Sequence, residues 1–351
     1  MTSVVAAAVV LLAVTMVSCG DSDGEATSFT YAYGGGFIAS GEVGMYLPIT
    51  TGCWEDAGLD IEVIPAGGSR NALQLLISGD APVVTFAPDG VAQAHLEGED
   101  LVSVYSRISP PNSALAIPAG SDIASLQELE GATIGVGSLS AGQAFYTIGL
   151  LGDAGLEEGD YELLPTGFNP AEAVQALESD AVDAITYWSG FYGILENEGY
   201  EFTYYQWEGL DDAPGFVIAT SQEYLDENED VITAMGRCEA MATVYAKENP
   251  EAAVRAYWEV YPENKPADIP EEEALQREIH VMQKNLDYNN ETAEGWGFQS
   301  PGGWDSYVAF LANAEIISEP IPAGELYTND LIEDMNDFDA EEVRDSASEA
   351  G

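Results

Sequence analysis

The amino-acid sequence predicts an α/β fold with two lobes and a hinged cleft, and three observations support this. The chain has 351 residues, about two domains at the usual 100–200 residues each. From residue 29 onward, short apolar strands alternate with helix-length segments, which is typical of a mostly parallel sheet. A helix-then-strand segment recurs at a separation of 101 residues (177 − 76 = 101), which suggests one such unit in each lobe. The matching positions are Leu76, Ser78, Val84, Thr85 and Phe86 against Leu177, Ser179, Ile185, Thr186 and Tyr187.

The N-terminal sequence has the features of an export signal. Val4 to Val17 is an apolar run of the size of a signal-peptide core, too short to span a bilayer comfortably. The stretch from Met16 to Cys19 resembles the lipobox of exported lipoproteins, which implies that Cys19 is lipidated and that an acidic tether over 19–28 holds the protein at the membrane surface. An ordinary cleaved signal peptide and a core strand are the alternatives. No basic residue precedes the apolar core, so the chain could lack its true start.

The next segments form the first α/β set. A strand is expected over 29–33, followed by the glycines 34–36, a helix around 43–50, a strand over 59–64, a helix over 70–77 and a strand over 83–86. Ser69 is placed to cap the helix that begins at Arg70, and Gly79 to end it.

The second set repeats this arrangement. It comprises a strand over 132–136, a helix from Ser140 or Gly142 to about Leu151, a helix from Asn169 to about Glu178, and a strand over 184–188. Asn169-Pro170 is a strong helix start, because it combines a side-chain cap with a proline in the first turn.

After residue 214 the chain is expected to return to the first lobe. A strand over 215–220 precedes helices over 231–247, 250–261, 271–286 and 304–314. The crossings around 109–118 and 211–214 make a hinge. The predicted divisions are a signal peptide (1–18), the tether (19–28), lobe 1 (29–119 plus 214–335), lobe 2 (120–213) and an acidic tail (336–351).

Cys53 and Cys238 remain once Cys19 is assigned to lipidation. An even remainder in an exported chain suggests a disulfide, and two buried free thiols are the alternative.

The charge is extreme, with 62 acidic residues against nine basic ones and a net charge of −53. Such a surface repels phosphate backbones, so nucleic acid is excluded as a partner. Hydrophobic residues make up 46% of the chain, enough for a packed core. A bias spread over the whole chain suggests that the protein works in high salt, where charges are screened.

The usual signs of catalysis are missing. The two histidines, His95 and His280, are expected at half-buried or surface positions, and no zinc, serine-hydrolase or paired-cysteine motif occurs. Gly135-Val136-Gly137-Ser138 is half of a dinucleotide fingerprint, with Ser140 in place of the third glycine. We expect no catalytic residue, metal or cofactor.

The predicted strand ends instead supply a binding cleft, because ligands of open α/β sheets bind at the carboxyl ends of strands. Aromatic faces with a few polar groups suit a small planar solute. Arg70 could receive an anion or pair with a local acid. The candidate binding residues are Tyr33, Gly36, Phe37, Ser69, Arg70, Pro88, Asp89, Ser138, Ser140, Tyr187 and Trp188.

Several motifs resemble those of the solute-binding proteins of ABC importers, in the thiamine-pyrimidine-precursor, aliphatic-sulfonate and nitrate/taurine group. They are the stretches Gly52–Ile61, Leu76–Phe86, Ser125–Gly131 and Leu326–Asn329. The resemblance implies a two-lobed periplasmic-binding-protein fold of type II that closes on a small solute. Its partners would be a membrane permease with its ATPase, and its location extracytoplasmic.

Within this group, Tyr327-Thr328-Asn329 and Gly295–Phe298 are most similar to the thiamine-pyrimidine-precursor branch, which includes vitamin binders such as those for riboflavin. Glu42 falls where many members carry histidine, and its carboxylate could accept bonds from an amino-heterocycle. A sulfonate, taurine, nitrate or vitamin solute stays open, as does a sensory or adhesion role. Fungal relatives are pyrimidine-synthesising enzymes, but their cysteine-rich motif and active-site histidine do not occur here.

Overall fold

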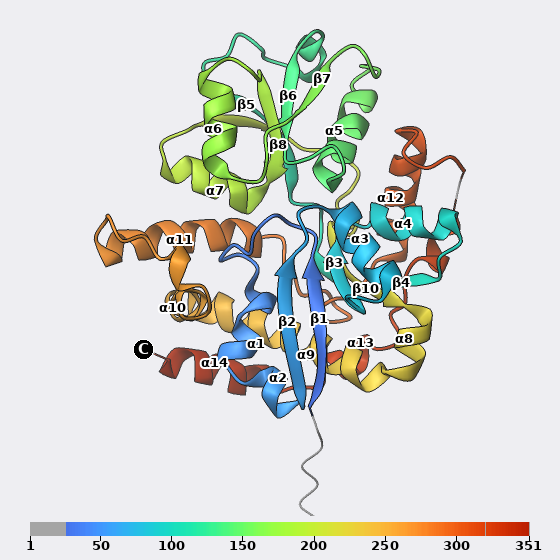
Figure 1. Cartoon of the computed structure of the whole chain (residues 1–351), viewed down its shortest axis with the longest axis vertical. Helices are drawn as coiled ribbons and strands as arrows, with labels where there is room; N and C mark the ends of the chain where they lie inside the picture. The colour runs from blue at the N-terminus through green and yellow to red at the C-terminus, as the bar shows by residue number, and fades with distance from the viewer. Residues whose placement is uncertain (1–25, 320, 351) are drawn as a thin grey trace, which may run out of the picture.

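The computed structural model describes residues 26–319 and 321–350, and it confirms the α/β class with two lobes (Figure 1). Each lobe is built on a five-stranded sheet with the same layout. No helix in the described part of the chain is both long and apolar enough to cross a bilayer. The predicted signal peptide and Cys19 lie outside the described residues.

The sheet of the first lobe has the order β2-β1-β3-β10-β4. β1 pairs in parallel with β2 and β3, whereas β10 runs antiparallel to β3 and β4. Alternate residues of β1 serve opposite faces: Tyr31 and Tyr33 pack toward the long helix α9, and Ala32 packs with α3 and α4. The strands are β1 (Thr27–Tyr33), β2 (Leu59–Pro65), β3 (Val83–Phe86), β4 (Leu101–Ile108) and β10 (Phe216–Ser221).

The second sheet has the order β7-β6-β8-β5-β9, with β6 parallel to its neighbours and β5 antiparallel to its own. β3 and β8 therefore hold equivalent places, each preceded by a helix (α3 and α6), which accounts for the repeat seen in the sequence. The strands are β5 (Ser113–Pro118), β6 (Thr133–Val136), β7 (Glu162–Pro165), β8 (Ala184–Trp188) and β9 (Phe202–Tyr205).

The helices of the two α/β sets are α1 (Leu47–Thr50), α2 (Cys53–Asp56), α3 (Ser69–Ser78), α4 (Asp89–Glu97), α5 (Gly142–Asp153), α6 (Pro170–Glu178) and α7 (Ser189–Asn197), with 3-10 turns η1 (Val43–Met45) and η2 (Leu126–Leu129). The sequence predicts α1, α3, α5 and α6 close to these positions, whereas α2, α4 and α7 were not predicted. Asn169 caps α6 as expected, accepting a bond from the Ala171 amide at 3.0 Å. Ser69 does not cap α3: Gly68 holds the N-cap position, and the Ser69 hydroxyl instead accepts from the Ala87 amide at 3.4 Å.

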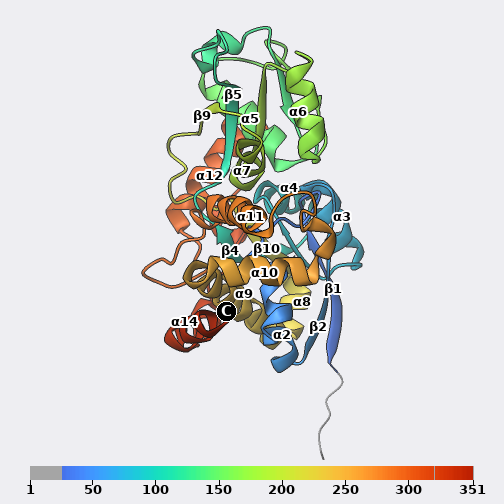
Figure 2. The ribbon, with the colours of Figure 1, turned by 90° about the vertical axis from the view of Figure 1, so that its left-hand side faces the viewer.

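The C-terminal part is helical and covers the first lobe (Figure 2). It comprises α8 (Gln222–Glu227), α9 (Glu229–Glu248), α10 (Pro250–Val260), η3 (Pro262–Asn264), α11 (Glu271–Leu286), α12 (Pro301–Asn313), η4 (Ala323–Glu325), α13 (Ile332–Met335) and α14 (Ala340–Glu349). The segment 336–351, expected as an acidic tail, therefore contains a helix. α14 packs on α9 through the buried Val343 and Ala347, one turn apart, and its acids face solvent.

The chain passes between the lobes earlier than predicted. β4 ends at Ile108, and β5, which begins at Ser113, already pairs with β8 of the second sheet. Residues 113–119, assigned to lobe 1 in the sequence analysis, are thus part of the second sheet up to Pro118. The return runs between β9 and β10.

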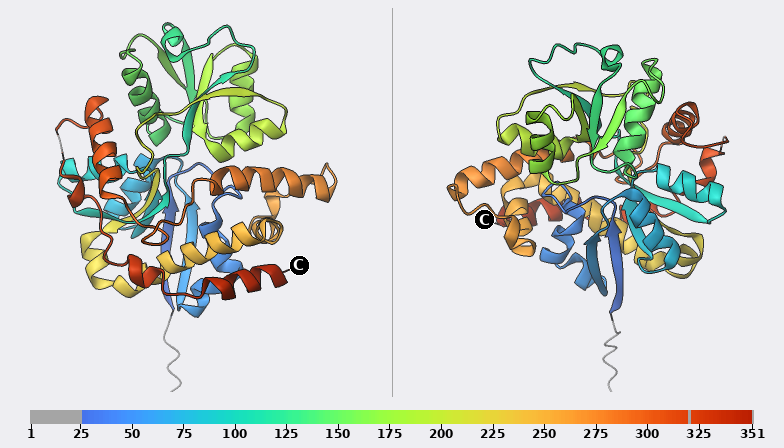
Figure 3. Two further views of the ribbon diagram at one scale, coloured as in Figure 1. Left: turned by 180° about the vertical axis from the view of Figure 1, so that it is seen from behind. Right: turned by 45° about the horizontal axis from the view of Figure 1, so that its top comes forward.

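Two late helices also touch the second lobe. α11 lies against α7, and α12 reaches α5, where the rings of Phe310 and Tyr146 are 6.5 Å apart (Figure 3). The first lobe thus supports the second from two sides of the crossover.

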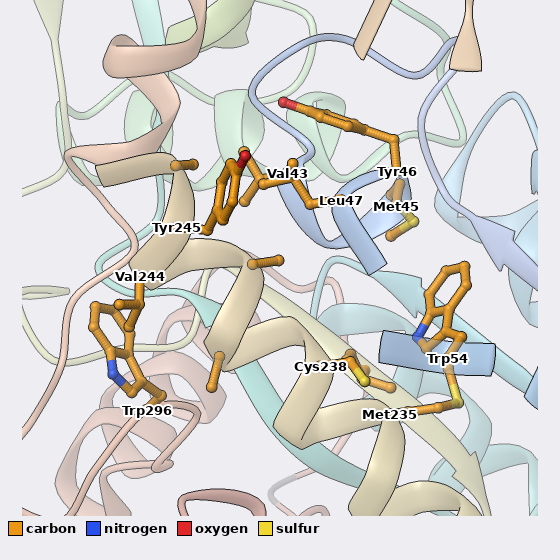
Figure 4. Close-up of a cluster of buried hydrophobic side chains, with 14 of the residues drawn as sticks. Val43, Met45, Tyr46, Leu47, Trp54, Met235, Cys238, Val244, Tyr245 and Trp296 are labelled. Atoms are coloured by element: carbon orange, nitrogen blue, oxygen red, sulfur yellow. The ribbon is translucent and has the colours of Figure 1, made fainter. Parts of the chain in front are cut away.

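The core of the first lobe surrounds α9 and the short helices after β1 (Figure 4). A disulfide joins Cys53 on α2 to Cys238 on α9, with their Cα atoms 5.9 Å apart. It connects the N-terminal third of the chain to the C-terminal helices.

Candidate functional site

A pocket lies between the lobes, beside the crossover strands and the carboxyl ends of β1 and β8. Its walls come from both lobes. The lining residues are Tyr33, Gly34, Gly35, Glu42, Ser69, Ala87, Ile108, Pro111, Asn112, Ser113, Gly142, Gln143, Tyr146, Trp188, Gly215, Phe216 and Tyr307.

Aromatic side chains form much of this wall. The rings of Tyr33 and Phe216 lie 5.7 Å apart on the first-lobe side. Trp188 is the last residue of β8 in the second lobe, and its ring centroid lies 5.9 Å from that of Phe37 in the first lobe. Such faces provide stacking surfaces for a planar ring.

Glu42 is the only charged residue among those that line the pocket, and it is 2% exposed. It directly precedes η1 and is held from three elements. Its Oε2 accepts from Arg107 of β4 at 2.9 Å, and its Oε1 accepts from the Tyr33 hydroxyl at 3.0 Å and from Asn285 of α11 at 3.3 Å. The carboxylate is therefore fixed at the pocket wall.

Arg107 serves a second carboxylate as well. Its Nε donates to Oε1 of Glu239 on α9 at 2.7 Å. Burial raises the pKa of Glu239, and the neighbouring Arg107 charge opposes that rise. Burial next to Glu42 also raises the pKa of Tyr33, so its hydroxyl stays protonated and donates. One buried cation thus faces two buried carboxylates.

A pair of buried amides links Glu42 to the crossover. The side-chain amide of Asn112 donates to Oδ1 of Asn285 at 2.7 Å, and the main-chain carbonyl of Asn112 accepts from the main-chain amide of Ser189, at the start of α7, at 2.9 Å. Asn285 in turn donates to the Gly41 carbonyl at 3.0 Å. Hydrogen bonds thus connect Glu42, through Asn285 and Asn112, to both lobes.

The lobes meet closely at one edge of the pocket. A methyl group on Gly142, the first residue of α5, would lie 2.6 Å from the Ala87 Cβ and 3.3 Å from a carboxylate oxygen of Asp89. Glycine at this position therefore permits the contact. Asp89 is 2% exposed, and burial raises its pKa to about 7.

The structure brings together only part of the predicted site. Tyr33, Glu42, Ser69 and Trp188 line the pocket. Six more predicted residues lie beside the pocket or where the two lobes meet, a boundary called the seam below. Gly36 lies against Phe168, and Phe37 lies against Trp188. Pro88 and Asp89 are at the start of α4, and the hydroxyls of Ser138 and Ser140 lie 3.0 Å apart.

Two predicted residues are placed elsewhere. Tyr187 points into the core of the second lobe, where it stacks on Phe191 at 3.8 Å and bonds to Thr166, because its neighbour Trp188 takes the outward face of the strand end. Arg70 is exposed on α3 and does not line the pocket.

The residues that surround Glu42 were not predicted from the sequence. Arg107 is the one charge in the buried run of β4, and Glu239 interrupts an apolar helix face, so both carried a signal of buried pairing. Asn112 and Asn285 carried none. Within residues 26–319 and 321–350, no group of three or more His, Cys, Asp and Glu could hold a metal ion, and His95 and His280 lie outside the pocket.

Comparison with known proteins gives a family and a fold. The model of the family described as "NMT1/THI5 like" matches residues 41–253. The chain is 23% identical over 292 residues to the formylaminopyrimidine-binding protein of Halalkalibacterium halodurans, covering 81% of this chain and 85% of that protein. It is 25% identical over 214 residues to the riboflavin-binding protein RibY of Chloroflexus aurantiacus, covering 60% and 58%.

Among solved structures, the alkanesulfonate-binding protein SsuA of Xanthomonas axonopodis pv. citri superimposes with a TM-score of 0.65 at 15% identity, covering 87% of this chain and 99% of that one. These relatives are solute-binding proteins. The chain has the two-lobed fold of periplasmic binding proteins and belongs to the NMT1/THI5-like family.

Proposed function

We propose that this chain is the extracytoplasmic solute-binding component of an ABC importer and that its solute is a small amino-bearing heteroaromatic compound, such as a thiamine-pyrimidine precursor. The observation that carries this proposal is a fixed glutamate, Glu42, in an otherwise uncharged aromatic pocket. A carboxylate accepts hydrogen bonds from exocyclic amino groups and ring N–H groups, while the tyrosine and tryptophan rings hold the plane of the heterocycle.

An anionic solute fits this pocket less well. A sulfonate or nitrate needs an available cation, yet Arg107 already donates to two carboxylates and does not line the pocket, and Arg70 lies outside the pocket as well. An anion placed beside Glu42 would be repelled in a low-dielectric site. The formylaminopyrimidine-binding relative supports the choice of an amino-heterocycle.

The small size of the cavity supports a pair of lobes that move apart to admit the solute. The pocket encloses about 40 Å³, whereas occupied small-molecule sites are typically about 300–1,000 Å³. The lobes must therefore part to admit even a pyrimidine, and a flavin would demand a larger separation. We take the arrangement with Gly142 against Ala87 as the closed form.

Delivery would pass the solute to a membrane permease driven by its ATPase, with the protein held at the membrane surface through lipidated Cys19. This anchor rests on the sequence from Met16 to Cys19 alone. Cys19→Ala should move the protein from the membrane to the soluble fraction, and a variant still bound to membranes would contradict lipidation.

An enzymatic role has less support. A pyrimidine-synthesising relative would need a histidine in the site, and both histidines of this chain pair with glutamates elsewhere: His95 with Glu325 and His280 with Glu196.

Isothermal titration calorimetry in high salt tests the proposal with four probes: formylaminopyrimidine, riboflavin, an alkanesulfonate and nitrate. We expect only the pyrimidine to bind tightly. Glu42→Gln should weaken it about 10-fold to 100-fold, since a hydrogen bond to a charged group is worth about 1.5–3 kcal/mol. Glu55→Gln, at an exposed position on α2, is the control. Tight sulfonate or nitrate binding by the wild type would overturn the proposed solute class.

A further inference from the structure

We propose that Glu239 is a specificity-determining residue that acts through Arg107 without touching the solute, so that the pocket selects solutes that are cationic or become protonated on binding. This inference rests on the proposed function, because it concerns the solute class of the same site. It concerns a residue on α9, outside the set that lines the pocket.

Hydrogen bonds connect the three charges in series, Glu239 to Arg107 and Arg107 to Glu42, and this series is called the row below. Arg107 uses Nε for Glu239 at 2.7 Å and a terminal nitrogen for Glu42 at 2.9 Å. The guanidinium side chain is 1% exposed and both carboxylate side chains are 3% exposed, so water screens none of them. The order is Glu239, Arg107, Glu42, pocket.

The net charge of Glu239, Arg107 and Glu42 determines how the row attracts a solute. An isolated Arg107–Glu42 pair would be neutral and would offer the solute little net attraction. With Glu239 on the far side, Arg107 is shared between two carboxylates, and the row carries one negative charge in excess when both are ionised. The excess charge is felt where the row meets the pocket, at Glu42, because no other charged side chain lines that pocket.

The chain makes room for the second carboxylate. Gly44, within η1, lies directly against the Glu239 carboxylate, and a Cβ at this position would clash with it. The turn that carries Glu42 is thus shaped around Glu239. A buried second carboxylate is costly to retain for stability alone, since removing water from an ion costs several kcal/mol. Its electrostatic effect on the neighbouring pocket accounts for its presence.

The consequence is a defined class of solute. A 4-aminopyrimidine combines a donor amino group with a ring nitrogen that can take up a proton, so it can bring a positive charge to Glu42. The matching 4-oxopyrimidine keeps one ring N–H donor, but it replaces the amino group by a carbonyl oxygen, which a carboxylate repels, and its ring takes up a proton far less readily. The negative row should favour the first compound over the second.

The test measures the affinity ratio of 4-aminopyrimidine to 4-oxopyrimidine in the wild type, Glu239→Gln and Glu239→Asp. We expect the ratio to fall about tenfold in Glu239→Gln, a change of about 1.4 kcal/mol. Glu239→Asp keeps the charge and should retain most of the preference. Thermal unfolding of each variant checks the fold.

The outcomes separate the inference from the proposed function. If the wild type binds neither probe nor formylaminopyrimidine, the proposed function fails. If Glu42→Gln loses the preference while Glu239→Gln keeps it, the function stands and this inference is overturned. Equal losses in Glu239→Gln and Glu239→Asp would also overturn it, because shape rather than charge would then matter. Should Glu239→Gln not fold, Arg107→Lys replaces it: the substitution changes the geometry but keeps the count of charges, so the ratio should stay near the wild-type value, and a tenfold fall would reject the inference.

Discussion

At the scale of single residues, Arg107 is the side chain on which the charge balance of the pocket depends. Its Glu42 partner is 65 residues away in sequence and its Glu239 partner 132 residues away. Both carboxylates are buried with it. Loss of this cation would leave two buried anions unpaired, which is far less favourable than loss of an exposed pair.

Arg107→Met should therefore lower the free energy of unfolding by about 3–5 kcal/mol. Urea unfolding at fixed salt concentration measures the change. Arg255→Met is the matched control, because Arg255 also pairs with two glutamates, Glu251 and Glu271, but on the exposed surface. The control should lose less than about 1 kcal/mol. Similar losses in the two variants would contradict a buried network.

The limits of prediction from sequence are also clearest at this scale. The scarcity of bases drew attention to Arg70, which lies beside a predicted helix start, but the structure leaves it exposed. The sequence around Arg107 marks it as a charge within an apolar strand, but its partners depend on α9 and η1 folding against β4, contacts that no local pattern encodes. Glu42 was found through family resemblance and not through its own neighbours.

At the scale of elements, the start of α5 fits against the start of α4 because residue 142 has no side chain. Gly142→Ala would place a methyl group 2.6 Å from the Ala87 Cβ. The closed arrangement should be disfavoured by about 1–3 kcal/mol, the usual cost of overpacking. Solute affinity should then fall about tenfold or more, while the separated lobes stay folded.

Gly152→Ala on the same helix is the control for this change, since a methyl group there meets nothing within 4 Å. Titration calorimetry with formylaminopyrimidine gives the affinities, and small-angle X-ray scattering gives the separation of the lobes. Equal affinities for the two alanine variants would show that this contact does not control closure.

The disulfide is a second contact between elements that we expect to matter for stability, because it joins α2 to α9 across 185 residues of sequence. Replacing both Cys53 and Cys238 by serine should reduce the free energy of unfolding by about 2–5 kcal/mol. Urea unfolding of the variant and the wild type measures this. Titration of two free thiols in denatured, unreduced wild-type protein would contradict the bond.

Elements with strong local signals were predictable and those defined by long-range pairing were not. The Asn169 cap placed α6 well, and the helix expected over 231–247 lies within α9. β5 was assigned to the crossover, because Ser113–Pro118 becomes a strand only by pairing with β8 and β9. The acid-rich sequence of α14 concealed its two inward positions, Val343 and Ala347.

At the scale of the whole molecule, closure of the two lobes is coupled to protonation of Asp89, because closure places the second lobe against this carboxyl group. This carboxyl group lies at the seam, with Gly142 of α5 over one oxygen. The titratable side chain that faces it is Tyr307 of α12 at 3.5 Å, and Gln93 of its own helix lies at the same distance. Burial raises the pKa of Tyr307 as well, so that hydroxyl stays neutral and brings no charge.

The sign of the pH dependence follows from this burial. In the closed form the pKa of Asp89 is raised from 3.8 to about 7. When the lobes part, water reaches the group and its pKa moves back toward 3.8. Between these values the closed form binds a proton that the open form does not, so acid favours closure. The closed form loses this advantage as the pH rises through about 7.

Affinity for formylaminopyrimidine should accordingly weaken between about pH 5 and about pH 7 in the wild type and level off above that, measured by calorimetry with buffer heats corrected. Asp89→Asn mimics the protonated group in both the open and the closed form, so its affinity should match that of the wild type at the acid end of this range, exceed it at about pH 7, and lose most of this slope. Any remaining slope belongs to Glu239 or to the solute itself, because these titrate identically in both proteins. The same slope in Asp89→Asn and wild type would exclude Asp89 from closure. A slope of opposite sign in the wild type would mean that the α5 amides stabilise the carboxylate more than burial penalises it.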